Sequence, residues 1–175
     1  MDFAYSDKVK ALQEQLTQFM EREIAPRDKE WHELTEAGTF PPAFCKDIKG
    51  KAREEGLWNM FMPALPDDVP GTRCSNLDYA PLAEIMGRIY WAPEMFNCNA
   101  PDTGNMEVFH MFGTDEQKEQ YLTPLFNGEI RSAFCMTEPE VASSDATNVQ
   151  TRIEKVGNEY VINGRKWFIT NAAHP

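Results

Sequence analysis

Residues 131–171 read RSAFCMTEPEVASSDATNVQTRIEKVGNEYVINGRKWFITN, and this stretch decides how the rest of the chain is interpreted. Its first part, Arg131–Thr137, is mostly apolar and stops at Glu138-Pro139. Because proline has no N–H to donate to a ladder, we expect a strand that ends there. A polar loop rich in small hydroxyl side chains, Ser143–Thr147, follows it.

Turn signals divide the remainder of the stretch into short strand-like runs. Gly157-Asn158 breaks the first run, and Asn163-Gly164 joins the last two. Asn-Gly favours the positive φ angles of a type I′ hairpin turn. The stretch therefore predicts an antiparallel meander whose loop carries the polar side chains.

The residues before this stretch predict helices and no strands. Apolar residues recur at steps of three and four, and serine, threonine or proline at the starts and proline or glycine near the ends set the boundaries. The predicted helices run from Ser6 to an end or kink at Pro26, from Pro41 to Gly56, from Ser75 to about Tyr90 with Leu77 facing inward, from Asp102 to Met111, and from Thr114 to Gly128.

The predicted fold class is α+β, with an all-α domain at residues 1–130 and the start of a small antiparallel β domain at residues 131–175. A meander that ended at Pro175 could hardly close its edges. We therefore expect a truncated protein with an incomplete β domain.

Composition excludes several classes of function. A net charge of −11 disfavours nucleic-acid binding, which needs a basic surface. The four cysteines form no CxxC pair and the histidines lack metal-ligand spacing, so we expect no metal site and a cytoplasmic or other reducing compartment. We find neither a secretory signal nor an apolar run long enough to span a membrane.

Several motifs resemble those of the flavin-dependent acyl-CoA dehydrogenases. They are FCMTEPEVASSDATN at residues 134–148 and YVINGRKWFITN at residues 160–171. FNCNAPDTGNMEVFHMFGT at residues 96–114, together with PEVASSDATN, is most similar to the branch of family members ten and eleven. The likeness extends over essentially the whole chain. It implies a helical domain, a central β domain and a C-terminal helical domain that this chain lacks.

The resemblance also implies a set of cofactor-binding residues. From the residues alone, Phe168 and Thr170 would share one face of a strand, which fits either ordinary core packing or contact with a planar heterocycle. The resemblance favours FAD and places Phe168 and Thr170 against the flavin ring. It assigns Phe134, Met136 and Thr137 to the flavin wall and Ser144 to the pyrophosphate. Phe168 departs from the tryptophan usual in the family.

The acidic residues near this site fit acid–base chemistry or a structural role. We expect Glu138 and Glu140 to be structural or solvated, and Asp145 to fix its loop as an acceptor. In the family the carboxylate base lies in the C-terminal helical domain, so no catalytic residue is assigned to this chain.

The function implied by the resemblance is FAD-dependent α,β-dehydrogenation of an acyl-CoA to a trans-2-enoyl-CoA, with electrons passed to electron-transferring flavoprotein. The full-length protein would be a homodimer or homotetramer, and this chain alone would be inactive. The alternatives are a flavin oxidase or monooxygenase of the same fold, a non-catalytic truncated form that associates with partners, and a helical binding module unrelated to flavin.

Overall fold

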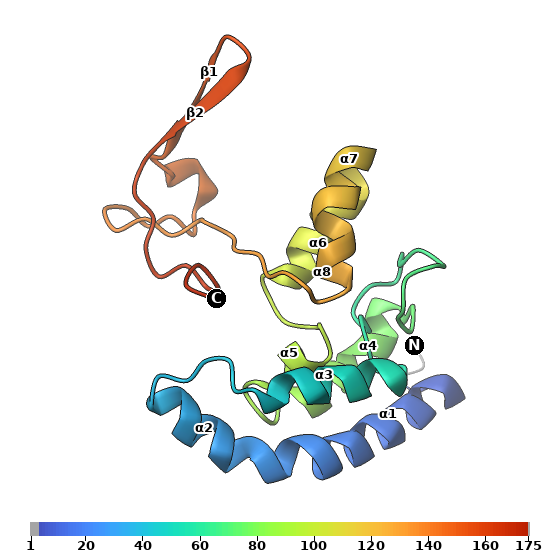
Figure 1. Ribbon diagram of the computed structural model, residues 1–175. Helices are drawn as coiled ribbons and strands as arrows, with labels where there is room; N and C mark the ends of the chain where they lie inside the picture. The colour runs from blue at the N-terminus through green and yellow to red at the C-terminus, as the bar shows by residue number, and fades with distance from the viewer. Residues whose placement is uncertain (1–3, 175) are drawn as a thin grey trace. The chain divides into compact units, whose positions relative to one another are not determined.

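A computed structural model describes residues 4–174 of the chain. The chain divides into two compact units, one extending to Ile130 and the other beginning at Arg131. We call them the helical unit and the β unit (Figure 1). The first contains the α-helices, and the second contains a small antiparallel sheet and a 3-10 turn at Ala146–Asn148, so the predicted fold class is confirmed.

The helical unit begins with a long, bent helical rod. Helix α1, Asp7–Phe19, starts where the Ser6 hydroxyl accepts a hydrogen bond from the Val9 amide. The rod continues through a π turn at Met20–Ile24 and a 3-10 turn at Ala25–Arg27 into α2, Asp28–Glu36 (Figure 1). The helical rod therefore continues past Pro26, because a proline in the first turn of a helix removes no hydrogen bond.

The other helices lie close to their predicted positions. Helix α2 and the short helix α5 were not predicted, and Leu77 faces solvent although its helix was predicted correctly. A capping box between Thr114 and Gln117 starts the last helical run. The bounds are α3 Phe44–Glu54, α4 Asn76–Met86, α5 Ala92–Met95, α6 Asp102–Phe112, α7 Asp115–Gln117, a π turn at Lys118–Leu122, and α8 Thr123–Phe126.

Buried side chains on two loops of the helical unit donate hydrogen bonds to the carbonyls at the end of α8. The Asn97 Nδ2 group donates to the Leu125 carbonyl at 2.9 Å and to Asn59 Oδ1 at 2.8 Å. The Trp58 indole N–H and Asn59 Nδ2 donate to the Phe126 carbonyl at 2.8 Å and 3.1 Å. Since carbonyls at a helix end have no partner in the helix, these side chains satisfy groups that would otherwise be buried at a cost.

The β unit contains one hairpin. Strand β1, Arg152–Val156, pairs antiparallel with β2, Glu159–Asn163 (Figure 1). Gly157 opens the two-residue loop with a φ of +64°, which glycine adopts without steric cost.

Two predicted strands and one predicted turn of the meander are wrong. In the part of the chain that the structure describes, neither residues 131–137 nor the residues after Asn163 form a strand. Asn163 ends β2 instead of opening a hairpin turn. Gly164 has a different role, because an added Cβ would lie 2.2 Å from Thr151 Oγ1. Its lack of a side chain allows close approach, and Gly157-Asn158 makes the turn.

Candidate functional site

A buried carboxylate, Glu138, lies at the centre of the β unit. Its side chain accepts hydrogen bonds from the amides of Gln150 and Thr151 at 2.8 Å and 2.9 Å. It also accepts from Thr151 Oγ1 at 2.6 Å and from Lys166 Nζ at 2.8 Å. The Lys166 ammonium, the Thr151 hydroxyl and the Gln150 amide lower the pKa of Glu138 to about 2. The carboxylate is buried and bonded to four groups of the protein, so of the two roles expected for Glu138 the structure shows the structural one.

The loop Ser143–Thr147, which we call the serine loop, is bonded to the same residue. The Glu138 amide donates to the buried Ser143 hydroxyl at 2.7 Å. Two residues on, Asp145 accepts from the Thr147 amide at 3.0 Å and from the Thr147 hydroxyl at 2.6 Å, which lowers the pKa of Asp145. The predicted role of Asp145 as a loop-fixing acceptor is therefore confirmed. Ser144, between these anchors, is exposed.

Two segments far apart in the sequence are bonded to each other in the β unit. The Trp167 amide donates to the Thr137 carbonyl at 3.2 Å, and Lys166 Nζ donates to the Met136 carbonyl at 2.9 Å. Asn171 Nδ2 donates to the Ser132 carbonyl at 3.1 Å. We call residues 132–138 and 166–171 the paired segments. Their pairing combines one backbone bond with side-chain bonds.

The sequence-predicted cofactor residues lie on these segments and on the serine loop. Phe134, Met136 and Thr137 belong to the first segment, and Phe168 and Thr170 to the second. The Phe134 and Phe168 side chains are 61% and 84% exposed. Met136 is half-buried, and Thr137 and Thr170 are exposed.

The strand alternation predicted for Phe168 and Thr170 is wrong. Phe168 has a φ of +50°, in the left-handed region, and the Ala172 amide donates to the Ile169 carbonyl at 3.2 Å in a turn. No pleat therefore sets the two side chains on one face. The ring of Phe168 lies beside that of Trp167, with centroids 4.7 Å apart and planes inclined by 43°.

Cofactor sites are lined mainly by apolar and aromatic side chains, with a few polar groups that fix the orientation of the ligand. The exposed rings of Phe134 and Phe168 supply the first, and the exposed hydroxyls of Thr137 and Thr170 supply the second. The residues present therefore fit a flavin.

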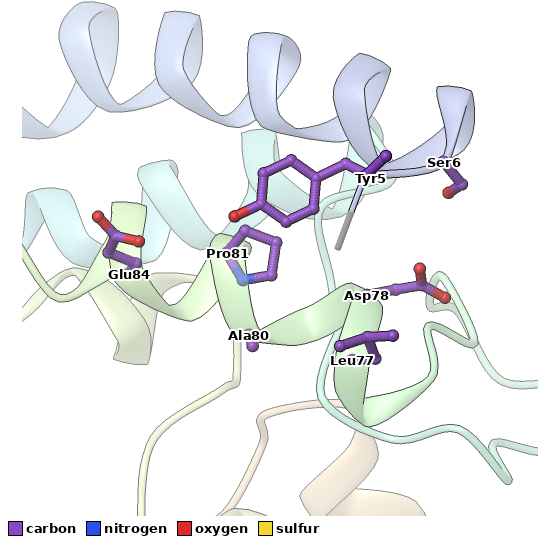
Figure 2. A pocket seen from close by; sticks show the side chains of 8 residues that line it. Tyr5, Ser6, Leu77, Asp78, Ala80, Pro81 and Glu84 are labelled. Carbon is purple, nitrogen blue, oxygen red and sulfur yellow. The ribbon is translucent and has the colours of Figure 1, made fainter. Parts of the chain in front are cut away.

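Hollows in the helical unit offer less chemistry. A pocket of about 280 Å³ lies between α4 and the segment before α1, where Figure 2 shows Tyr5 reaching toward Pro81. Its lining carboxylates, Asp78 and Glu84, have no cationic side chain among the lining residues. A groove of about 620 Å³ runs beside α3 and includes Cys45. Burial raises the pKa of Cys45 to about 11, so the thiol is no nucleophile near neutral pH.

Two absences hold for residues 4–174. No group of three or more histidine, cysteine, aspartate or glutamate side chains is placed to hold a metal ion. No helix in that range has the length and apolarity to cross a membrane.

Sequence reasoning missed Lys166 and Thr151 as parts of this site, and it named Ser143 in the polar loop without predicting its bond to Glu138. Lys166 had a usable signal, because it directly precedes the apolar run Trp167–Ile169, where a cation that becomes buried needs an anionic partner. Ser143 and Thr151 had none, since hydroxyl residues in a polar loop are ordinary.

Two family models together match almost the whole chain. The family described as acyl-CoA dehydrogenase, N-terminal domain, matches residues 6–129, and acyl-CoA dehydrogenase, middle domain, matches residues 133–175. Acyl-CoA dehydrogenase family member 11 of Gallus gallus is 51% identical over 90% of this chain, and family member 10 of Mus musculus is 45% identical over 97%.

A solved structure from Mycobacterium abscessus, provisionally assigned as an acyl-CoA dehydrogenase, superposes with a TM-score of 0.88 at 47% identity over 98% of this chain. The chain spans 20% and 16% of the length of the two curated relatives and 44% of the solved chain.

Proposed function

Because this chain belongs to the acyl-CoA dehydrogenase family, we propose that its β unit forms one wall of an FAD site. The protein would act in the α,β-dehydrogenation of an acyl-CoA to a trans-2-enoyl-CoA. Electron-transferring flavoprotein would take up the electrons, and the full-length protein would assemble as a homodimer or homotetramer.

One observation carries the proposal. The paired segments bring Met136 next to Lys166 through a bond at 2.9 Å and Thr137 next to Trp167 through a bond at 3.2 Å, although thirty residues separate each pair in sequence. Two exposed rings and two exposed hydroxyls accompany this junction. The exposed rings have little value for packing, because they leave apolar area in water.

Each residue has a part in the proposal. Phe168 and Phe134 supply apolar surface for the flavin ring and keep water from it. Thr137 and Thr170 offer hydroxyl groups to its polar edge, and Ser144 offers a hydroxyl and a backbone N–H to the pyrophosphate. When bound, FAD would accept the hydride that leaves the β carbon of the acyl group.

No residue of this chain is proposed as the base that removes the α proton. Glu138 is unsuited to that task, because its pKa of about 2 makes it a very weak base and its oxygens are occupied by four hydrogen bonds. We therefore propose that the 175-residue chain binds FAD but does not turn over acyl-CoA by itself.

A titration of the purified protein with FAD, followed in the visible spectrum, tests the proposal. We expect a bound-flavin spectrum in the wild type and an affinity about tenfold weaker in Phe168→Ala, because the variant loses an aromatic contact. Tyr160→Ala removes an exposed ring from β2, outside the site, and should leave the affinity unchanged. Anaerobic addition of a long-chain acyl-CoA should not bleach the flavin. A colourless protein, or equal affinities in both variants, would contradict the FAD wall.

The hairpin favours a second candidate, a non-catalytic form that associates with a partner. Ile153 and Ile162 are cross-strand neighbours and both are exposed, so this sheet presents apolar surface to water. Absence of FAD binding together with stable hetero-oligomers, measured by light scattering, would support this candidate over the first.

A further inference from the structure

One ion pair joins the parts of the β unit that carry the candidate cofactor residues. The Lys166 ammonium donates both to Glu138 Oε1 at 2.8 Å and to the Met136 carbonyl at 2.9 Å. The side chains of Lys166 and Glu138 are 20% and 4% exposed. Charge-assisted hydrogen bonds shielded from water are stronger than those of a surface pair.

Glu138 extends this junction to two further parts of the chain. Its carboxylate holds the amides of Gln150 and Thr151, where the chain enters β1, and its own amide holds Ser143. One buried residue therefore connects the first paired segment, the serine loop, the start of the hairpin and the second paired segment.

The candidate cofactor residues are covalent neighbours of these anchors. Met136 and Thr137 immediately precede Glu138, Phe168 lies two residues after Lys166, and Ser144 follows Ser143. A shift of either anchor must move those side chains, because one or two peptide units give them little independent freedom.

We propose that Glu138 and Lys166 are positioning residues that hold the paired segments in register and thereby set the affinity of the β unit for FAD. The FAD part of this inference rests on the proposed function. The pair contributes no reacting group, and its effect reaches the cofactor through Met136, Thr137 and Phe168.

The chain supplies a matched control pair one or two residues away. Arg165 and Glu140 also link the two regions, with an N–O distance of 3.7 Å. Their side chains are 74% and 60% exposed, so water screens the attraction. Neutralising this second pair removes the same charges without touching the buried junction.

The test compares Lys166→Met with Arg165→Met in the 175-residue protein, by two measurements. The first is hydrogen exchange of the Trp167 amide, which donates to the Thr137 carbonyl. The second is the visible titration with FAD. In Lys166→Met we expect exchange at Trp167 to be about tenfold faster and FAD binding about tenfold weaker, since a shielded charged hydrogen bond is lost. Arg165→Met should match the wild type, and Lys166→Arg should restore both properties.

Each result has a definite meaning. Equal Trp167 exchange in Lys166→Met and Arg165→Met would overturn the proposal, as would loss of protection in Lys166→Arg. If the wild type binds no FAD, the proposed function fails, and Trp167 exchange still decides whether the pair holds the segments. Exchange of the β1 and β2 amides shows whether a variant has unfolded the whole β unit. If Lys166→Met has done so, Lys166→Arg is compared with the wild type instead. Equal exchange at Trp167 in these two proteins then supports the proposal, and faster exchange in Lys166→Arg overturns it.

Discussion

At the scale of single residues, the acidity of Glu138 follows from its donors. Four hydrogen bonds, one of them from the Lys166 ammonium group, favour the charged form, whereas burial alone would have done the opposite. The carboxylate therefore stays ionised at pH values at which an ordinary glutamate, with a pKa of 4.5, is protonated.

This lowered pKa predicts an acid-sensitive β unit. Since the pKa falls from 4.5 to about 2 on folding, Glu138 stabilises the unit above pH 4.5, and this contribution is lost as the pH falls toward 2. We expect Glu138→Gln to be less stable than the wild type at pH 7, with the difference shrinking below pH 4.5. Thermal loss of the β1 and β2 amide signals in NMR spectra measures it. Glu140→Gln is the control, and a difference independent of pH would contradict the linkage.

At the scale of elements, features set by neighbouring residues were predicted correctly, and features that depend on residues far apart in the sequence were not. Ser6, Ser75 and Thr114 cap helices as expected, because a cap needs only a hydroxyl and an amide three residues on. The strands predicted at residues 131–137 and after Gly164 are wrong, because a strand also needs a partner ladder that no local pattern specifies.

The same distinction between local and long-range interactions holds in the candidate site. The role of Asp145 was predictable, because an aspartate two residues before Thr147 favours a local hydrogen bond. The partners of the Glu138 carboxylate are at least 12 residues away, so no local pattern specifies them. The bond from Lys166 to Glu138 spans 28 residues and was not predictable from spacing. The assignments of Phe134, Met136, Thr137, Ser144, Phe168 and Thr170 to FAD remain predictions.

The close contact at Gly164 yields a prediction for the end of β2. An added Cβ would lie 2.2 Å from Thr151 Oγ1, and Thr151 in turn donates to Glu138. We therefore expect Gly164→Ala to destabilise the β unit by about 1–3 kcal/mol, the usual cost of overpacking. In contrast, Gly50→Ala in α3 meets nothing within 4 Å and should stabilise the helical unit by about 0.5–1 kcal/mol. Urea unfolding followed by NMR amide signals of each unit measures both, and tolerance of alanine at Gly164 would show that Thr151 moves aside.

At the scale of the whole molecule, the two units are stabilised by different interactions. Every buried hydrophobic side chain among the described residues lies between Val9 and Phe126, in the helical unit. The buried residues of the β unit are Glu138 and Ser143, both polar, and its two-stranded sheet is exposed throughout. A hairpin of this size is marginal in water without further packing, so hydrogen bonds to Glu138 carry much of the order in the β unit.

This division predicts that the helical unit folds on its own. A polypeptide of residues 1–130 should retain a cooperative thermal transition, because its core is complete without residues 131–175. At about 0.7 kcal/mol per residue near 60 °C, the helical unit accounts for about 90 kcal/mol of unfolding enthalpy. Calorimetry of the 175-residue chain should give little more than this, since the β unit buries no apolar core whose exposure would absorb heat. The shorter polypeptide should melt within a few degrees of the longer one. A non-cooperative transition in residues 1–130, or an enthalpy that falls by a third on shortening, would show that the two units fold as one.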